Sequence, residues 1–117
     1  MQNLINYYHV ENNYYVEVRN TCRVINRKKY DTSTASLLMY EYVGRTNEQN
    51  AKMVMLLQKR NGEYFSYIVH FLNFNMDGRY LIDECEISPL SEDEAKDLVE
   101  RYADGNLYIK LFGDVDE

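Results

Sequence analysis

Two dipeptides, Asn61-Gly62 and Asp77-Gly78, constrain the fold more than any other feature of this chain. Both supply residues that accept the positive φ angles of a two-residue type I′ turn, and such turns join antiparallel strands. The segments beside them are rich in β-branched and aromatic residues, which favour strands. The sequence therefore predicts a three-strand meander of Lys52–Lys59, Tyr64–Phe74 and Arg79–Ile87.

Two-residue turns at these places would also decide which side chains share a face of the meander. In that register one face carries Met53, Met55, Ser66, Ile68, His70, Leu72, Leu81, Cys85 and Ile87. The other face carries Val54, Leu56, Phe65, Tyr67, Val69, Phe71, Tyr80 and Ile82. Both faces are largely apolar, so we expect other parts of the chain to cover both.

Residues 47–60 also fit a helix, with Thr46 as its N-cap, Gln49 completing a capping box and Gly62 ending it. We favour the strand and keep the helix as the alternative.

Shorter strands are predicted over residues 14–18, 22–25 and 37–43, again from their β-branched and aromatic content. Asn12-Asn13 and Asn20-Thr21 are predicted to be turns, because Asn tolerates the left-handed backbone conformation.

A helix is predicted over residues 92–104. Ser91-Glu92-Asp93-Glu94 has the pattern of a capping box, and Gly105 suits the C′ position. Apolar residues follow at helical spacing, namely Ala95, Leu98, Val99, Tyr102 and Ala103. Residues 107–112 then fit a returning strand, and residues 113–117 form an acidic tail.

Together these elements predict one α+β domain over residues 1–117, an antiparallel sheet of six or seven strands with one C-terminal amphipathic helix packed on it. A chain of 117 residues should bury about two-thirds of its unfolded surface, which is enough for a real core. No apolar stretch approaches the ~20 residues of a membrane-spanning helix, and no signal peptide is apparent. We therefore expect a cytoplasmic protein of a bacterial cell, with Cys22 and Cys85 reduced.

The net charge of −6 is divided unevenly along the chain. Residues 1–60 carry 9 basic and 5 acidic groups, a net of +4, whereas residues 61–117 carry 4 basic and 14 acidic groups, a net of −10. The acidic half argues against binding of nucleic acid by the molecule as a whole, because affinity for phosphates depends on Lys and Arg.

The acidic residues concentrate on the predicted helix and the strand before it. Asp93, Asp97, Glu100 and Asp104 recur at helical spacing opposite the apolar stripe, and Glu84 and Glu86 precede them. Neighbouring carboxylates would lie roughly 5–6 Å apart along the helix axis, a spacing of the same order as that of phosphates in a nucleic-acid strand. We interpret them as a surface for a protein partner with a basic groove, where arginine–carboxylate pairs replace arginine–phosphate pairs. The alternative is an ordinary solvated helix face.

A weaker candidate surface combines aromatic and basic residues of the first half. Residues 19–29 hold five basic groups and no acid, and Tyr14 and Tyr15 lie close by in the sequence. Arg23 and Arg27 with these tyrosines would suit phosphate contacts and base stacking. We favour the alternative, a solvated face. The 12 tyrosines also lead us to expect some exposed rings at a protein interface, because tyrosine is common in binding hot spots.

Three patterns of catalytic or metal-binding chemistry are present only in part. Asn73 to Glu84 nearly matches a calcium-binding loop, but Asn stands where a charged Asp is expected and Pro89 blocks the following helix. His70 and Cys85 would lie opposite each other in the predicted register, yet no third catalytic partner or full zinc ligand set accompanies them. Phosphate-binding and serine-nucleophile motifs are absent. We therefore expect no enzymatic activity, no cofactor and no metal.

In size, composition and charge the chain resembles small acidic proteins of phages and mobile elements from low-GC Gram-positive bacteria, a group that includes anti-CRISPR inhibitors. The resemblance aligns no segment and assigns no role to a residue. It implies a non-enzymatic inhibitor of a host nucleic-acid-handling complex, such as a Cas nuclease. The alternative is a small accessory or homodimeric interaction domain without an inhibitory role.

Overall fold

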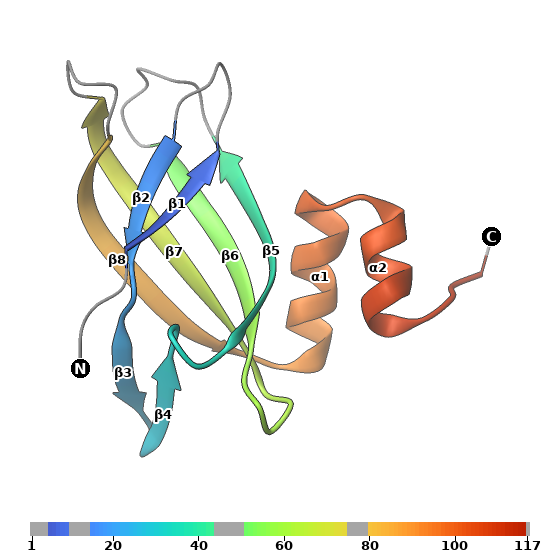
Figure 1. The fold of residues 1–117 in the computed structure, drawn as a ribbon. Helices are drawn as coiled ribbons and strands as arrows, with labels where there is room; N and C mark the ends of the chain where they lie inside the picture. Colours follow the sequence, from blue (N-terminus) through green and yellow to red (C-terminus); the bar gives the residue numbers. More distant parts are fainter. Residues whose placement is uncertain (1–4, 10–14, 44–50, 75–79, 117) are drawn as a thin grey trace.

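The computed structural model describes the backbone of residues 5–9, 15–43, 51–74 and 80–116, and the side chains of residues 19–43, 51–70 and 85–116. Within these residues it contains eight strands and two helices (Figure 1). They are β1 (Ile5–His9), β2 (Tyr15–Arg19), β3 (Cys22–Ile25), β4 (Lys28–Asp31), β5 (Ser36–Val43), β6 (Lys52–Gln58), β7 (Tyr64–Phe74), β8 (Tyr80–Leu90), α1 (Glu92–Tyr102) and α2 (Gly105–Phe112).

The strands form three antiparallel sheets, in the orders β1-β2, β3-β4 and β5-β6-β7-β8. The predicted α+β class with antiparallel pairing is confirmed, but a single sheet of six or seven strands is wrong for the described residues. Among the described residues β1 pairs with β2 and β3 pairs with β4, and neither pair joins the sheet of β5 to β8. The predicted turn at Asn20-Thr21 is also wrong, because the Thr21 and Thr32 backbones continue the pairing of β3 with β4, with the Thr32 amide donating to the Thr21 carbonyl at 3.0 Å. The predicted turn at Asn12-Asn13 lies outside the described residues.

The meander predicted from the two turn signals is present as β6, β7 and β8, so the strand interpretation of residues 52–58 is confirmed. The turn between β6 and β7 differs from the prediction. It is a three-residue loop, Arg60-Asn61-Gly62, closed by the Lys59 amide donating to the Glu63 carbonyl at 2.8 Å. Only Gly62 has a positive φ, +95°, as in a three-residue hairpin with a glycine bulge. The Asp77-Gly78 turn and residues 47–50 lie outside the described residues.

A turn with two positive φ angles occurs elsewhere, at Asn26-Arg27 between β3 and β4. The φ angles are 52° and 64°, and Ile25 pairs with Lys28 across the turn. These are the features of a type I′ turn. Asn accepts this conformation readily, whereas Arg rarely adopts it, so the local sequence gives only half of the usual signal.

The extra loop residue at 60–62 shifts the register of β6 against β7 by one residue. Leu57 pairs with Phe65 and Met55 pairs with Tyr67. Because side chains alternate along a strand, this shift moves the whole set on β7 to the opposite face. The predicted faces are therefore wrong for β6 against β7: Phe65, Tyr67 and Val69 share a face with Met53, Met55 and Leu57.

The sheet β5–β8 carries an apolar cluster on each face. The inner core consists of buried Tyr30, Ala51, Met53, Met55, Leu57, Phe65, Tyr67, Val69 and Ile87. The outer core consists of buried Met39, Leu56, Ala95 and Val99, with partly buried residues of α1, α2 and adjoining strands around them. The expectation that both faces of the meander are covered is confirmed for the described side chains.

The inner core lies under the β3–β4 hairpin. Tyr30 of β4 packs edge-on against Phe65, with ring centroids 5.5 Å apart. The Tyr67 hydroxyl donates to the Arg19 carbonyl at 2.9 Å and lies 3.0 Å from the Thr21 hydroxyl. Burial raises the pKa of Tyr67, which keeps it a neutral hydrogen-bond donor. These contacts attach the segment between β2 and β3 to the main sheet.

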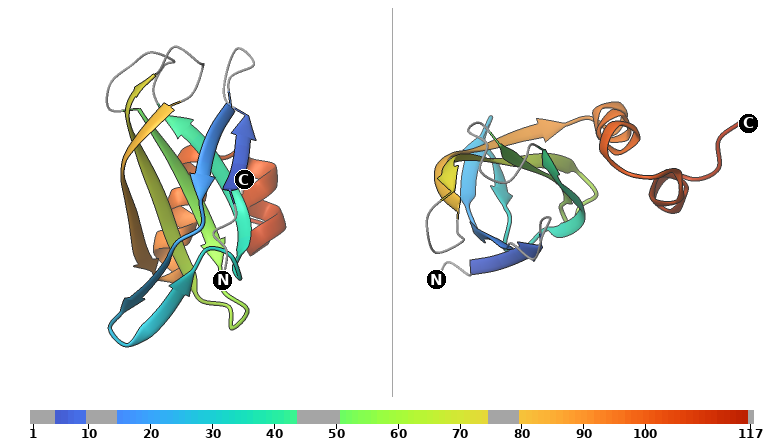
Figure 2. Two further views of the ribbon diagram at one scale, coloured as in Figure 1. Left: turned by 60° about the vertical axis from the view of Figure 1, so that its left-hand side comes forward. Right: turned by 90° about the horizontal axis from the view of Figure 1, so that it is seen from above.

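The outer core lies under the two helices. Helix α1 begins with the predicted capping box: the Glu94 amide donates to the Ser91 hydroxyl at 3.1 Å, and the Ser91 amide donates to the Glu94 carboxylate at 2.9 Å. Figure 2 shows both helices outside the arrangement of strands, with α2 beyond α1. Within the part of the chain that the structure describes, no helix is long and apolar enough to cross a membrane.

Two predictions for the C-terminal segment are wrong. Helix α1 ends at Tyr102, so Gly105 is not its C′ residue, and residues 107–112 form part of α2 rather than a strand. The physical reason lies at Asp104, whose carboxylate accepts a hydrogen bond from the Leu107 amide at 3.0 Å and so caps a new helix. The apolar side chains of α2 then pack against α1 within the outer core. The chain therefore has two C-terminal helices where one was predicted.

Candidate binding surface

The first candidate surface is the exposed side of α1. Asp93, Asp97 and Glu100 are all exposed, while Ala95 and Val99 on the opposite side of the helix are buried. Burial of the apolar stripe against the sheet fixes the rotation of the helix, so the three carboxylates must point away from it. We call Asp93, Asp97 and Glu100 the acidic row. The sequence predicted their arrangement correctly.

The acidic row has no hydrogen-bond or ion-pair partner among the described side chains. None of its three carboxylates makes a hydrogen bond or an ion pair with another side chain that the structure describes. Beside the row, Nζ of Lys96 lies 3.9 Å from the carboxylate of Glu92, so Lys96 pairs with Glu92 and not with a member of the row. At 1.5 Å of rise per residue the neighbouring members are separated by roughly 4.5–6 Å along the axis. The row is therefore a line of exposed charges on one helix that is available to a partner.

Asp104 departs from the predicted row. It follows the end of α1 and serves as the N-cap of α2, so it is not a fourth member on the same helix. Asp104 is nevertheless exposed, at the corner between the two helices.

The two acidic residues of β8 do not join the acidic row in a described contact. The Glu86 carboxylate lies 2.7 Å from Nε2 of His70 on the neighbouring strand. The side chain of Glu84 lies outside the described residues, although its backbone pairs with His70. The prediction that His70 and Cys85 lie opposite each other is wrong, because Cys85 pairs with Val69 and adjoins the inner core.

The weaker aromatic and basic surface is assembled only in part. Arg23 and Arg27 are exposed on the β3–β4 hairpin, which projects away from the helices (Figure 1). Arg23 is already engaged, donating to the Cys85 carbonyl at 3.2 Å. Tyr14 lies outside the described residues, and of Tyr15 only the backbone, in β2, is described. Among the seven tyrosines with described side chains, Tyr40 alone is exposed.

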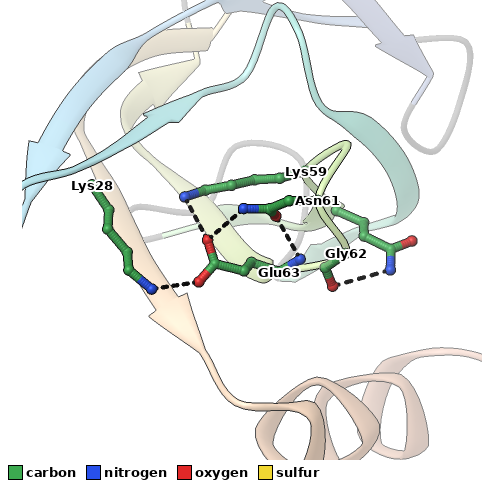
Figure 3. A network of polar contacts seen from close by, with 6 residues as sticks. Lys28, Lys59, Asn61, Gly62 and Glu63 are labelled. Carbon is green, nitrogen blue, oxygen red and sulfur yellow. Dashed lines mark hydrogen bonds and ion pairs between the residues drawn. The ribbon is translucent and has the colours of Figure 1, made fainter.

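A network around Glu63 joins the β3–β4 hairpin to the β6–β7 loop (Figure 3). One carboxylate oxygen lies 2.7 Å from Nζ of Lys28, and the other accepts from Lys59 at 3.2 Å and from Asn61 at 2.9 Å. Lys59 also lies over the Tyr30 ring, 3.6 Å from its centroid. The hydrogen bonds from Lys28, Asn61 and Lys59 lower the pKa of Glu63 from 4.5 to about 2. Sequence analysis missed this network because Lys28 and Glu63 are distant in the chain.

Glutamine in place of Glu63 should remove a pH-dependent part of the stability. The pKa is lower in the folded chain than in the unfolded chain, so the ionised carboxylate stabilises the fold above about pH 4.5. That contribution disappears as the pH falls towards about 2. Urea unfolding across this range should show the difference between wild type and Glu63→Gln narrowing towards acid. Lys28→Gln should reproduce part of the effect, and parallel profiles for wild type and both variants would contradict it.

A second candidate surface is a groove at the corner between α1 and α2. It has a volume of about 330 Å³ and is lined by Glu100, Ala103, Asp104, Gly105, Tyr108, Ile109 and Val115. The sequence pattern predicts a strand over residues 107–112, so it does not predict a groove between two helices. The local signal that could have revealed it is Asp104-Gly105 read as a helix start.

Among the side chains that the structure describes, no three or more His, Cys, Asp or Glu residues lie close enough together to hold a metal ion. Asn75, Asp77 and Gly78 of the calcium-like loop lie outside the described residues, and the segments on either side of the loop are strands β7 and β8.

Comparison of the chain with protein-family models, with curated proteins and with solved structures found no match. The functional interpretation therefore depends on the geometry and charge of these surfaces.

Proposed function

We propose that this chain is a non-enzymatic binding protein that uses the acidic row to occupy a basic, nucleic-acid-binding groove of a protein partner. The observation that carries the proposal is the set of three exposed carboxylates on α1, none of which has a hydrogen-bond or ion-pair partner among the side chains that the structure describes. Occupation of such a groove would exclude the nucleic acid, so the expected biological effect is inhibition.

Electrostatics and geometry both support this mechanism. A carboxylate accepts two parallel hydrogen bonds from an arginine, much as a phosphate does. The helix fixes the backbone positions that carry the three carboxylates, so only their side chains have to be ordered on binding. Exposed charges attract over roughly 8–10 Å at moderate ionic strength, which favours fast association with a basic groove.

A CRISPR nuclease is the first partner class to test. Such enzymes hold their nucleic acids in positively charged channels and read the adjacent DNA motif with arginines. The same chemistry occurs in other nucleic-acid-handling proteins, so the experiment should not assume one of them.

The test is capture of partners by immobilised protein from a nuclease-treated lysate of a low-GC Gram-positive bacterium, with quantification by mass spectrometry. We expect nucleic-acid-binding proteins to be retained, and to be released by added DNA or RNA and by salt. The variant Asp93→Lys/Asp97→Lys/Glu100→Lys should lose them.

A matched variant controls for the change in net charge. Glu41→Lys/Asp114→Lys/Asp116→Lys reverses three exposed acids outside the acidic row and should retain more of the captured proteins than the variant of the row does. Equal capture by the two variants would contradict the proposal. If the wild type instead captures nothing and elutes as a homodimer in size-exclusion chromatography with light scattering, the accessory-domain alternative is correct.

A further inference from the structure

The groove between α1 and α2 combines an apolar floor with an acidic rim. Ala103, Tyr108, Ile109 and Val115 supply the apolar surface, and Ile109 and Val115 are 42% and 59% exposed. The charged residues that line it are both acidic, Glu100 and Asp104, and no Lys or Arg is among its lining residues. An exposed apolar surface with an acidic edge suits a ligand that has both an apolar part and a positive charge.

The rim is held in place by local structure. Asp104 Oδ1 accepts from the Leu107 amide at 3.0 Å, which positions the carboxylate, and its second oxygen makes no hydrogen bond within the described residues. The end of α1 and the start of α2 meet here and carry opposite partial charges, so the negative charge of the rim comes from Glu100 and Asp104 themselves. The Tyr108 ring is supported by Phe112, with ring centroids 5.2 Å apart.

We propose that this groove binds one arginine side chain of the protein partner. This inference depends on the proposed function, because the partner is the same basic groove that meets the acidic row, and Glu100 belongs to both surfaces. The aliphatic stem of the arginine would lie on Ile109 and Val115, as long cationic side chains commonly lie along apolar surface. Its guanidinium would then pair with Glu100 and Asp104.

Arginine suits this groove better than lysine or a purely apolar residue. The planar guanidinium has five donors and reaches two carboxylates at once, and it also stacks on aromatic faces such as that of Tyr108. The lysine ammonium is a compact charge that holds its water more strongly. An apolar residue would cover the carboxylates without pairing them, which costs free energy.

The test uses two fluorescein-labelled peptides of equal length and charge, one with Arg-Gly-Ser repeats and one with Lys-Gly-Ser repeats. Fluorescence anisotropy at 0.15 M salt measures the two affinities. We expect the wild type to bind the arginine peptide about three- to tenfold more tightly, as a stacked and paired guanidinium allows. Equal affinities, or no binding of either peptide, would overturn the inference.

Two matched variants separate this inference from the proposed function. Glu100→Gln/Asp104→Asn removes the charges of the rim while Asn preserves the cap of α2, and it should abolish the preference for arginine. Asp93→Asn/Asp97→Asn removes the same charge from the acidic row away from the groove. It should weaken binding of both peptides and leave the preference unchanged.

The remaining outcomes are distinct. A preference that survives Glu100→Gln/Asp104→Asn would overturn the groove inference while the acidic row stands. Unchanged affinity of Asp93→Asn/Asp97→Asn for both peptides would instead contradict the proposed function. Ile109→Ser provides a further check, because this exposed side chain can change without opening the core, and its loss should weaken binding of the arginine peptide.

Discussion

Aspartate in place of Val99 should lower the free energy of unfolding by about 3–5 kcal/mol at pH 7, because it would place an unpaired charge in the outer core. Val99 is completely buried and packs with Ala95, Met39 and Leu56 where α1 meets the sheet. The hydrophobic side chains packed around Val99 offer the new carboxylate no charged partner. Urea unfolding followed by circular dichroism at 222 nm measures the loss.

The pH dependence of this variant distinguishes charge from shape. Burial would raise the pKa of the new carboxyl above that of the unfolded chain, so the variant should lose stability as the pH rises through neutrality and regain it towards pH 4. Asparagine has nearly the same shape as aspartate but no charge, so the stability of Val99→Asn should not show this additional pH dependence. If the stability of both variants changed equally with pH, the buried charge would not be the cause of the loss.

Alanine in place of Phe65 should have a similar cost, about 3–5 kcal/mol, through loss of packing rather than burial of charge. Phe65 is fully buried in the inner core and supports Tyr30 of the β3–β4 hairpin by an edge-on ring contact. Its removal leaves a cavity between the hairpin and the main sheet. Equilibrium unfolding in urea, with tyrosine fluorescence as the probe, should report the loss.

A matched substitution on the same sheet tests whether burial decides the effect. Leu37 of β5 is 39% exposed, so Leu37→Ala should cost under about 1 kcal/mol. Comparable losses for Phe65→Ala and Leu37→Ala would contradict the prediction that burial of the side chain decides the loss of stability.

Sequence analysis predicted the elements whose signals are local. The strands of the meander follow from β-branched and aromatic runs, and α1 follows from its capping box and apolar spacing. These patterns lie within a dozen residues, so they need no knowledge of tertiary contacts. The same holds for the acidic row, whose exposure follows from burial of the opposite helix face.

Features that depend on one backbone angle or on distant contacts were not predictable in this way. Asn61-Gly62 fits a two-residue or a three-residue turn equally well, and the difference moves every side chain of β7 to the other face. At Asp104-Gly105 the glycine suggested a helix end, whereas the aspartate starts a helix. The Glu63 network could not be predicted, because only the fold brings Lys28 close to Glu63. The groove would follow from the sequence only if Asp104-Gly105 were read as a helix start.

The position of the helices in the chain has a consequence for biosynthesis. The strands of the main sheet are completed at Leu90, but among the described residues the outer face of that sheet, with Met39 and Leu56, is covered by α1 and α2, which are made later. A nascent chain therefore carries an uncovered apolar surface until Phe112 has left the ribosome. Such surfaces favour aggregation and chaperone binding. The interval between synthesis of Leu90 and of Phe112 is thus the period in which this protein most needs protection.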